Sequence, residues 1–353
     1  MKPLIQLRSV CLVVALLLGG LFTQAASRPR YEVVDLGVVP GGGYPVQGRG
    51  INNAGQLTAY ALASNLYYRA CVFKNGALRD LGVGTNGSFP RRLNEAGQII
   101  GHFDTDWDPI TKGRDHAFLY SGGNVTDLSA LFGRYLAVNG MNNAGHIVGD
   151  AETDDGTSIV PFIYSNGVFQ LIHLPDVQFV DVNDAGHILA TINHPGPMLG
   201  EFTARAAIYK NGRIIELRLP RRSLWSIGLF LNKRGHAIGY GAGADQLGRG
   251  FVWSKGHART VRPLHGDTVT FLDDLNNSGE AVGHSSVPDF GSRAILWRDG
   301  RTHDLNRMIS KNSGWELHAA FGLNDRGQIV GVGSFAGEYR GFLLNPIKRG
   351  RGQ

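Results

Sequence analysis

Apolar residues in this chain come in short runs that glycine, asparagine and aspartate interrupt. The pair Ile99–Ile100, for example, lies between Gly97 and Gly101. No stretch after residue 27 repeats its apolar positions at helical spacing. Short apolar runs bounded by turn-forming residues are typical of β-strands joined by tight turns. The pattern therefore predicts an all-β chain.

One phrase occurs seven times: an apolar residue, then Asn–x–x–Gly, then a second apolar run. Its asparagines are Asn52, Asn94, Asn142, Asn183, Asn232, Asn276 and Asn324, at intervals of 42, 48, 41, 49, 44 and 48 residues. Asparagine starts a turn well because its side chain accepts a nearby backbone N–H, and glycine closes the turn in the left-handed conformation. Each phrase predicts a β-hairpin, and a period of this length indicates a solenoid or a propeller.

A second hairpin follows within each repeat, as at Phe73–Lys74–Asn75–Gly76 and Trp297–Arg298–Asp299–Gly300. Asn–Gly and Asp–Gly are the favoured residue pairs of the two-residue hairpin turn. The strand after this turn ends in Asp–Leu, for example Asp80–Leu81. Each repeat therefore holds four short strands, A to D, which is the composition of a propeller blade.

The two ends of the chain distinguish a closed ring from a solenoid. The last repeat stops after its third strand, Gly341–Leu344, whereas Tyr31–Gly37 supplies an isolated fourth strand with the same Asp–Leu–Gly ending. Pairing these two segments closes a ring and removes open sheet edges, whereas a linear solenoid needs polar caps. We predict an all-β, seven-bladed β-propeller of four-stranded blades, closed by the N-terminal strand.

The repeats resemble the extracellular HAF repeat family, which is named for a His–Ala–Phe triplet. That triplet is His116–Ala117–Phe118 here, and most other copies have arginine in place of the histidine. The phrases Asn–x–x–Gly–x–apolar–apolar–Gly and aromatic–x–Asn–Gly–x–x–x–Asp–Leu cover nearly the whole chain after residue 27. The resemblance implies an exported bacterial repeat protein and no established enzyme activity or ligand.

The first 26 residues have the three parts of a secretory signal peptide. Lys2 and Arg8 form a positive start, an apolar run spans Val10–Phe22, and Ala25–Ala26 offers a cleavage site. The apolar run is short for a membrane span, so the alternative of an uncleaved anchor is disfavoured. We expect a signal peptide at 1–26, one propeller domain at 27–346 and a basic tail at 347–353. The protein is then secreted or periplasmic and has no membrane span after cleavage.

Cleavage lowers the formal charge from +6 to +4, so the exported chain stays basic and attracts anionic polymers in a salt-dependent way. Only Cys71 remains of two cysteines, so no internal disulfide forms, and its apolar surroundings predict a core position. No basic stripe indicates nucleic-acid binding. His–Glu–x–x–His, Gly–x–Ser–x–Gly and phosphate-loop motifs are all lacking. We expect a monomer without a required cofactor.

Ligands of propellers usually bind at the face that carries the B–C and D–A loops, here called the top face. Six cations are predicted at the start of strand C: Arg69, His116, Arg205, Arg249, Arg293 and Arg340; the seventh blade has Val160. They form either a cationic ring for an anionic glycan or braces that each hold their own blade. Trp107 in a B–C loop, and Trp225 and Trp315 in D–A loops, are candidate sugar-stacking residues or loop anchors.

Alternating carboxylates at Asp104, Asp106 and Asp108, with Asp115 twelfth in the loop, are similar in spacing to a calcium loop. Pro109 stands where such loops need glycine, and aspartate replaces the terminal glutamate, so a solvated acidic loop is the alternative. Ca²⁺ is the one cofactor that the sequence suggests.

These observations favour an exported, non-catalytic binding protein that contacts envelope or extracellular polysaccharide, or a surface protein, through its top face. A propeller-fold polysaccharide hydrolase or lyase is the second hypothesis, and it requires converging acid and base residues at the channel mouth. A purely structural envelope protein is the third.

Overall fold

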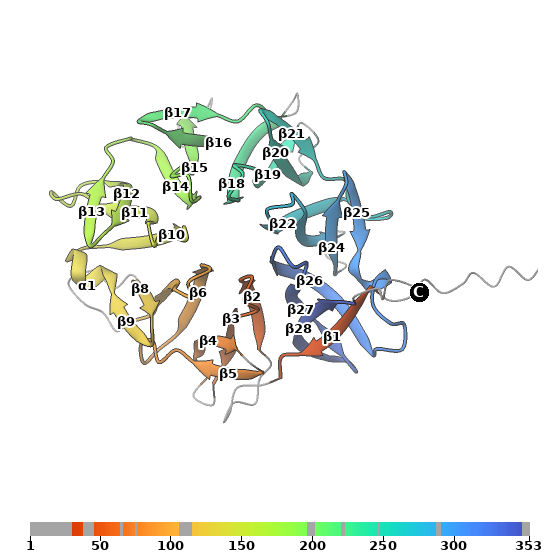
Figure 1. The fold of residues 1–353 in the computed structure, drawn as a ribbon. Helices are drawn as coiled ribbons and strands as arrows, with labels where there is room; N and C mark the ends of the chain where they lie inside the picture. The colour runs from red at the N-terminus through yellow and green to blue at the C-terminus, as the bar shows by residue number, and fades with distance from the viewer. Residues whose placement is uncertain are drawn as a thin grey trace, which may run out of the picture.

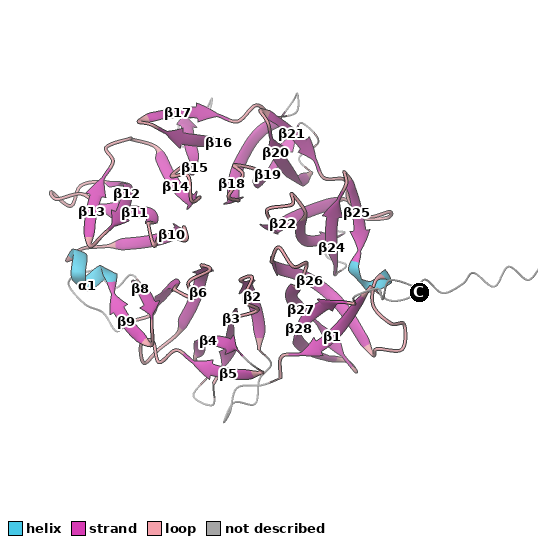
Figure 2. Ribbon diagram, viewed as in Figure 1, coloured by secondary structure: helices cyan, strands magenta, loops and turns pink. Residues whose placement is uncertain are grey.

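The computed structural model describes residues 30–37, 46–63, 66–74, 76–105, 115–195, 202–219, 223–243, 245, 247–286 and 291–347. Seven antiparallel sheets of four strands surround a central channel (Figure 1), and almost all of the ordered structure is β-strand (Figure 2). The chain is therefore the seven-bladed β-propeller that the repeats predict. Among the described residues, no helix has the length and apolarity to cross a membrane.

Consecutive strands form six of the blades, from the channel outwards. The first blade has β2 (Gln47–Ile51), β3 (Leu57–Leu62), β4 (Tyr68–Lys74) and β5 (Ala77–Asp80); the second has β6 (Ser88–Leu93), β7 (Ile99–Phe103), β8 (His116–Ser121) and β9 (Asn124–Asp127). The third has β10 (Leu136–Met141), β11 (Ile147–Glu152), β12 (Ile159–Ser165) and β13 (Val168–Leu171); the fourth has β14 (Val177–Val182), β15 (Ile188–Pro195), β16 (Phe202–Lys210) and β17 (Arg213–Glu216). The fifth has β18 (Ser223–Leu231), β19 (Ala237–Gly243), β20 (Gly248–Ser254) and β21 (His257–Thr260); the sixth has β22 (Val269–Leu275), β23 (Ala281–Ser286), β24 (Ser292–Arg298) and β25 (Arg301–Asp304).

The seventh blade joins the two ends of the chain. It contains β26 (Trp315–Leu323), β27 (Ile329–Phe335), β28 (Glu338–Pro346) and, outermost, β1 (Tyr31–Asp35). β1 pairs antiparallel with β28 from Tyr31 opposite Pro346 to Asp35 opposite Phe342. The predicted ring closure is confirmed, and the hydrophobic contacts of Tyr31 with the core between the sixth and seventh blades add to it.

Two short helices follow outer strands. The helix α1 (Leu128–Phe132) comes after β9, and the 3₁₀ helix η1 (Leu305–Arg307) comes after β25. Asp127 and Asp304 cap them, because their carboxylates accept the backbone N–H of Ala130 and Asn306. The aspartate of the Asp–Leu phrase thus ends strand D and starts the next segment.

The recurring glycine of strand B is explained by close packing. A Cβ on Gly101 would lie 2.1 Å from the carbonyl oxygen of Phe89 and 2.7 Å from the ring of Phe118. Gly149, facing Phe162, has the same role in the third blade. The phrase apolar–apolar–Gly therefore makes space for a fully buried phenylalanine of strand C, which is the last residue of the His–Ala–Phe triplet.

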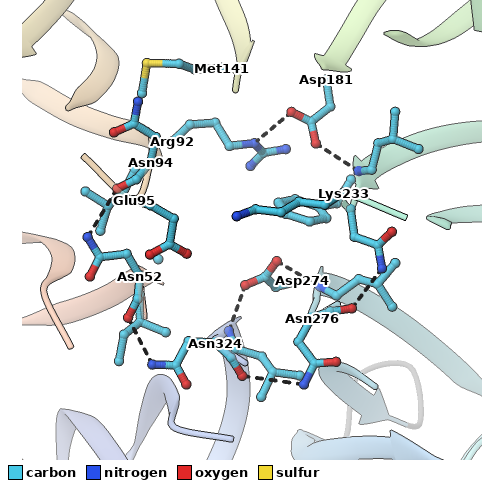
Figure 3. Close-up of a pocket in the computed structure, with 18 of the residues that line it drawn as sticks. Asn52, Arg92, Asn94, Glu95, Met141, Asp181, Lys233, Asp274, Asn276 and Asn324 are labelled. Atoms are coloured by element: carbon cyan, nitrogen blue, oxygen red, sulfur yellow. Dashed lines mark hydrogen bonds and ion pairs between the residues drawn. The ribbon is translucent and has the colours of Figure 1, made fainter. Parts of the chain in front are cut away.

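The seven repeat asparagines form a closed hydrogen-bonded ring around one end of the channel (Figure 3). Each Nδ2 donates to the main-chain oxygen of the next repeat asparagine, from Asn52 to Asn94 at 3.2 Å and finally from Asn324 back to Asn52 at 2.9 Å. Each Oδ1 accepts N–H groups of its own turn, as Asn183 does from Ala185 and His187. All seven are buried. The asparagine that shapes each hairpin therefore also links each blade to the next.

Candidate functional site

Each channel-facing strand is interrupted at the same residue. The pairing register of the innermost strand shifts three residues before the repeat asparagine in all seven blades, and the skipped residues are Arg49, Arg91, Asn139, Val180, Leu229, Asp273 and Phe321. A β-bulge redirects a side chain relative to its strand. All seven residues line cavities of the central channel. The fold therefore presents one side chain per blade to the channel, and these side chains include cationic, anionic, polar, aliphatic and aromatic groups.

Arg92 extends across the channel near the asparagine ring (Figure 3). Its Nη2 donates to the carbonyl of Leu229 at 2.8 Å, and its guanidinium lies 5.2 Å from the ring centroid of Phe230. Its Nε is 3.7 Å from Oδ1 of Asp181. Burial raises the pKa of Asp181, and the charge of Arg92 counteracts this rise. This arginine connects the second blade to the fourth and fifth, so it is a structural bridge, and it lines two cavities of the channel.

The space nearer the top face is a cavity of about 410 Å³ with cationic and aromatic walls. Its lining includes Arg49, Arg91, Arg92, Tyr60, Phe89, Phe321 and Asp273. Three arginines therefore face one carboxylate, so the cavity carries excess positive charge. His102 also lines it, but burial lowers the pKa of His102 and so favours its neutral form.

Arg49 and Arg91 have no carboxylate partner among the described residues. Arg49 lies between two rings, 4.8 Å from the centroid of Tyr60 and 4.7 Å from that of Phe321, and its Nη2 donates to the Tyr60 hydroxyl at 2.8 Å. Arg91 is exposed to the channel and, within the described part of the chain, donates to the carbonyl of Asn139 at 3.3 Å. Burial and nearby Arg92 lower the pKa of Arg91 to about 10, against the opposing charges of Asp181 and Asp150, so Arg91 remains charged at neutral pH.

Aromatic residues from adjacent blades pack together on two sides of the channel mouth. In the first blade Tyr60 contacts Phe89 of the second, and Phe89 stacks on His102. In the fifth blade Tyr240 stacks on Phe271 of the sixth, and Phe271 stacks on His284. Both triplets combine a strand-B tyrosine with the strand-A phenylalanine and strand-B histidine of the following blade.

The predicted strand-C cations all contact their own surroundings. Arg69 donates to the carbonyls of Gly84 and Thr85, His116 is 2.7 Å from Asp127, and Arg205 donates to the carbonyl of Leu224. Arg249, Arg293 and Arg340 pair with Asp245, Asp267 and Asp35, each at 2.8 Å. These contacts agree with the bracing alternative, and ligand binding by this set stays a prediction.

The predicted tryptophans are placed differently from one another, and Trp107 lies outside the described residues. Trp225 and Trp315 lie in strands β18 and β26, so their assignment to D–A loops was wrong. The strands extend further than the apolar pattern suggested, because Trp315 packs on Phe335 and Phe342 of its own blade. Trp225 packs edge-on against Tyr240 at 5.5 Å and so belongs to the second aromatic triplet.

The acidic loop is described only at its ends, and Asp106 and Asp108 lie outside the described residues. Asp104 is hydrogen-bonded to Asp115, and burial followed by the charge of Asp115 raises the pKa of Asp104. Among the described residues no group of three or more metal-ligating side chains occurs. Calcium binding by Asp104, Asp106, Asp108 and Asp115 stays a prediction.

Sequence reasoning placed His102 and His284 near the top face but missed the bulged residues and the tyrosines, although two signals locate them. The bulged residue always lies three positions before the repeat asparagine, as Arg49 does before Asn52. The second signal is the fourth residue of strand B. Tyr60, His102, Tyr240 and His284 are at this position in their blades. Both positions hold different residues in different repeats, and this variation distinguishes them from the repeated structural positions.

The sequence matches no known family and no curated protein, whereas solved structures share its fold. The β-propeller domain of the Trilobed protease from Pyrococcus furiosus superimposes with a TM-score of 0.57 at 11% identity, over 88% of this chain and all of that domain. A prolyl endopeptidase gives 0.54 at 9% identity, over 87% of this chain and 50% of that one. The extracellular domain of a putative one component system from B. thetaiotaomicron gives 0.51 at 12% identity, over 91% of this chain and 40% of that one. These similarities establish the propeller fold.

Proposed function

We propose that this chain is an exported, non-catalytic binding propeller, similar to HAF-repeat proteins, that receives an acidic group of an extracellular or envelope polysaccharide in its channel cavity. The observation that carries the proposal is the pair of arginines, Arg49 and Arg91, which face the cavity and pair with no carboxylate of the residues that the structure describes. Buried or enclosed arginines are normally paired with an anion, so an anionic ligand would complete this site.

The geometry of Arg49 suits recognition of a carboxylate. Tyr60 and Phe321 hold its guanidinium from both sides, and only one of its terminal nitrogens donates to the tyrosine hydroxyl. A guanidinium that is already oriented loses little conformational freedom when it makes paired hydrogen bonds to a carboxylate. The aromatic walls also provide faces for the apolar side of a sugar ring.

Export is part of the proposal and rests on the signal-like segment at 1–26. An exported basic protein meets acidic glycans outside the cell. The charge of the cavity would then add short-range selectivity to a general, salt-dependent attraction.

The test is isothermal titration calorimetry of residues 27–353 with oligogalacturonate and with a neutral glucan, at low and high salt. We expect oligogalacturonate alone to bind, more weakly at high salt. Arg91→Gln should weaken binding by roughly 10- to 100-fold, since hydrogen bonds to charged groups contribute about 1.5–3 kcal/mol. Arg79→Gln, on the exposed strand β5, is the matched control. Equal binding by both variants, or equal affinity for the neutral glucan, would contradict the proposal.

A further inference from the structure

The second aromatic triplet is a more regular stack than the first. The ring centroids of Tyr240 and Phe271 are 4.1 Å apart with an interplanar angle of 16°, and those of Phe271 and His284 are 4.9 Å apart, also at 16°. The corresponding angles in the first triplet are 68° for Tyr60 with Phe89 and 30° for Phe89 with His102. Three rings from two blades thus lie nearly parallel.

Gly248 makes the position of Tyr240 possible. A Cβ at Gly248 would lie 1.4 Å from the Tyr240 hydroxyl, so any larger residue at the start of β20 would displace the ring. Trp225 supports the same ring from its edge, and Tyr240 and Phe271 each remain half-buried. Both rings are therefore held in place by their neighbours while part of their surface stays accessible.

Asp273 adds hydrogen-bonding capacity beside this stack. It is the bulged residue of the sixth blade, and its Oδ2 lies 3.7 Å from Nδ1 of His284. Both of these atoms are buried and have no hydrogen-bond partner, while the two side chains are 32% and 24% exposed. Among the described residues no arginine or lysine pairs with Asp273. Because Oδ2 is buried against His284, the exposed part of the Asp273 side chain is the acceptor that a hydroxyl or ammonium group entering the cavity would meet.

The two triplets belong to opposite sides of the ring. The first belongs to the first and second blades and the second to the fifth and sixth, which lie on opposite sides of the ring (Figure 1). Asp273 and Arg91 line the same cavity. The cavity thus has a cationic side and an anionic side, each next to an aromatic stack.

We infer that Tyr240, Phe271, Asp273 and His284 form a second subsite, which takes a neutral or amino sugar linked to the acidic sugar held by Arg49 and Arg91. The inference rests on the proposed function, because the first subsite supplies the acidic end of the ligand. The ligand class is then an oligosaccharide that alternates uronic acid with a neutral or amino sugar. A polymer of uronic acid alone would bind through the first subsite only, because a carboxylate next to Asp273 is repelled.

The test uses hyaluronan fragments of increasing length, which alternate glucuronic acid and N-acetylglucosamine, with glucuronic acid as the shortest probe. Calorimetry would compare Tyr240→Leu, Asp273→Asn, Arg91→Gln and the control Asp299→Asn, which lies in an outer turn. We expect Tyr240→Leu and Asp273→Asn to weaken the longer fragments about tenfold, or about 1.4 kcal/mol, and to leave glucuronic acid unaffected. Arg91→Gln should weaken both.

Trp225 gives an independent signal, because a ring that stacks at Tyr240 should change its fluorescence, and Trp225→Phe should remove that change. Thermal melting identifies any variant that fails to fold. If Tyr240→Leu does not fold, Asp273→Asn, whose side chain has the same shape as the native one, still tests the subsite. Wild-type affinity in both subsite variants, with loss only in Arg91→Gln, would overturn the second subsite and leave the proposed function. If no acidic fragment binds the wild-type chain, the proposed function fails, and this inference fails with it.

Discussion

Replacing Asn183 by alanine should destabilise the whole propeller. The side chain of Asn183 makes three hydrogen bonds: Nδ2 donates to the carbonyl of Asn232 at 3.1 Å, and Oδ1 accepts from Ala185 at 3.1 Å and from His187 at 3.0 Å. Asn183 is only 3% exposed, so water does not readily replace these bonds. The substitution removes one link between the fourth and fifth blades and leaves the hairpin turn without its internal acceptor.

The magnitude follows from these three bonds. A typical hydrogen bond contributes about 1 kcal/mol net, so the loss is about 3 kcal/mol. The carbonyl of Asn232 keeps a second donor, the N–H of Gly235, so its desolvation adds little. For a domain of this size, about 3 kcal/mol lowers Tm by roughly 4–5 °C. Differential scanning calorimetry and urea denaturation would measure both values, with Asn124→Ala on the exposed strand β9 as control.

Asn183→Asp separates the two functions of the side chain. The carboxylate keeps the acceptor for Ala185 and His187 but places an ionised oxygen against the carbonyl of Asn232. Burial beside this carbonyl raises the pKa of the new aspartate in the folded state, so its protonated form, which can donate, is favoured. The variant should therefore match the wild type below pH ~4 and lose stability as the pH rises through the folded pKa. A change in Tm no larger than that of Asn124→Ala, or no pH dependence in Asn183→Asp, would refute this account of the ring.

Three further predictions concern closure, burial and reactivity. Deleting residues 31–35 removes the outer strand of the seventh blade and part of its core. Calorimetry should show a much larger fall in Tm for this deletion than for deletion of 348–353. Burial raises the pKa of Asp274 to about 7, above its unfolded value. The contribution of Asp274 to stability is therefore full below pH ~4 and is lost towards pH 7. Urea titrations should show the wild type losing stability over this range relative to Asp274→Asn. Burial raises the pKa of Cys71 to about 12, so alkylation of the thiol should proceed only at the rate of unfolding, and rapid labelling of the folded protein would contradict this.

The sequence was sufficient to predict the propeller because its repeated residues have physical functions that can be read locally. The Asn–x–x–Gly phrase specifies a turn, which follows from the residue types and their immediate neighbours. The split last repeat indicates closure, because each end of the chain supplies the part of a repeat that the other end lacks. The hydrogen bond from one asparagine to the next did not follow, because it joins residues more than 40 positions apart.

The direction of the variable side chains was not predictable in the same way. In a regular strand alternate residues face alternate sides, and that alternation would place Arg91 and Arg92 on opposite faces. The bulge in β6 breaks the alternation, so both reach the channel. A bulge depends on how two strands pair, so its fixed place before the repeat asparagine is recognised only once the pairing is known. The strand-C arginines, in contrast, were easy to find in the sequence because they recur in most repeats. The structure shows that they contact their own blades.

The distinction between repeated and variable positions explains where this fold can carry specificity. A residue that performs the same task in every blade contributes equally around the ring and gives the channel no preferred direction. The bulged positions do the opposite, since they place arginine in the first and second blades, apolar residues in the fourth and fifth, and aspartate in the sixth. A molecule in the channel therefore experiences positive charge on one side and negative charge on the other. Any ligand with an acidic end is favoured in one orientation, and this preference arises entirely from residues that break the repeat.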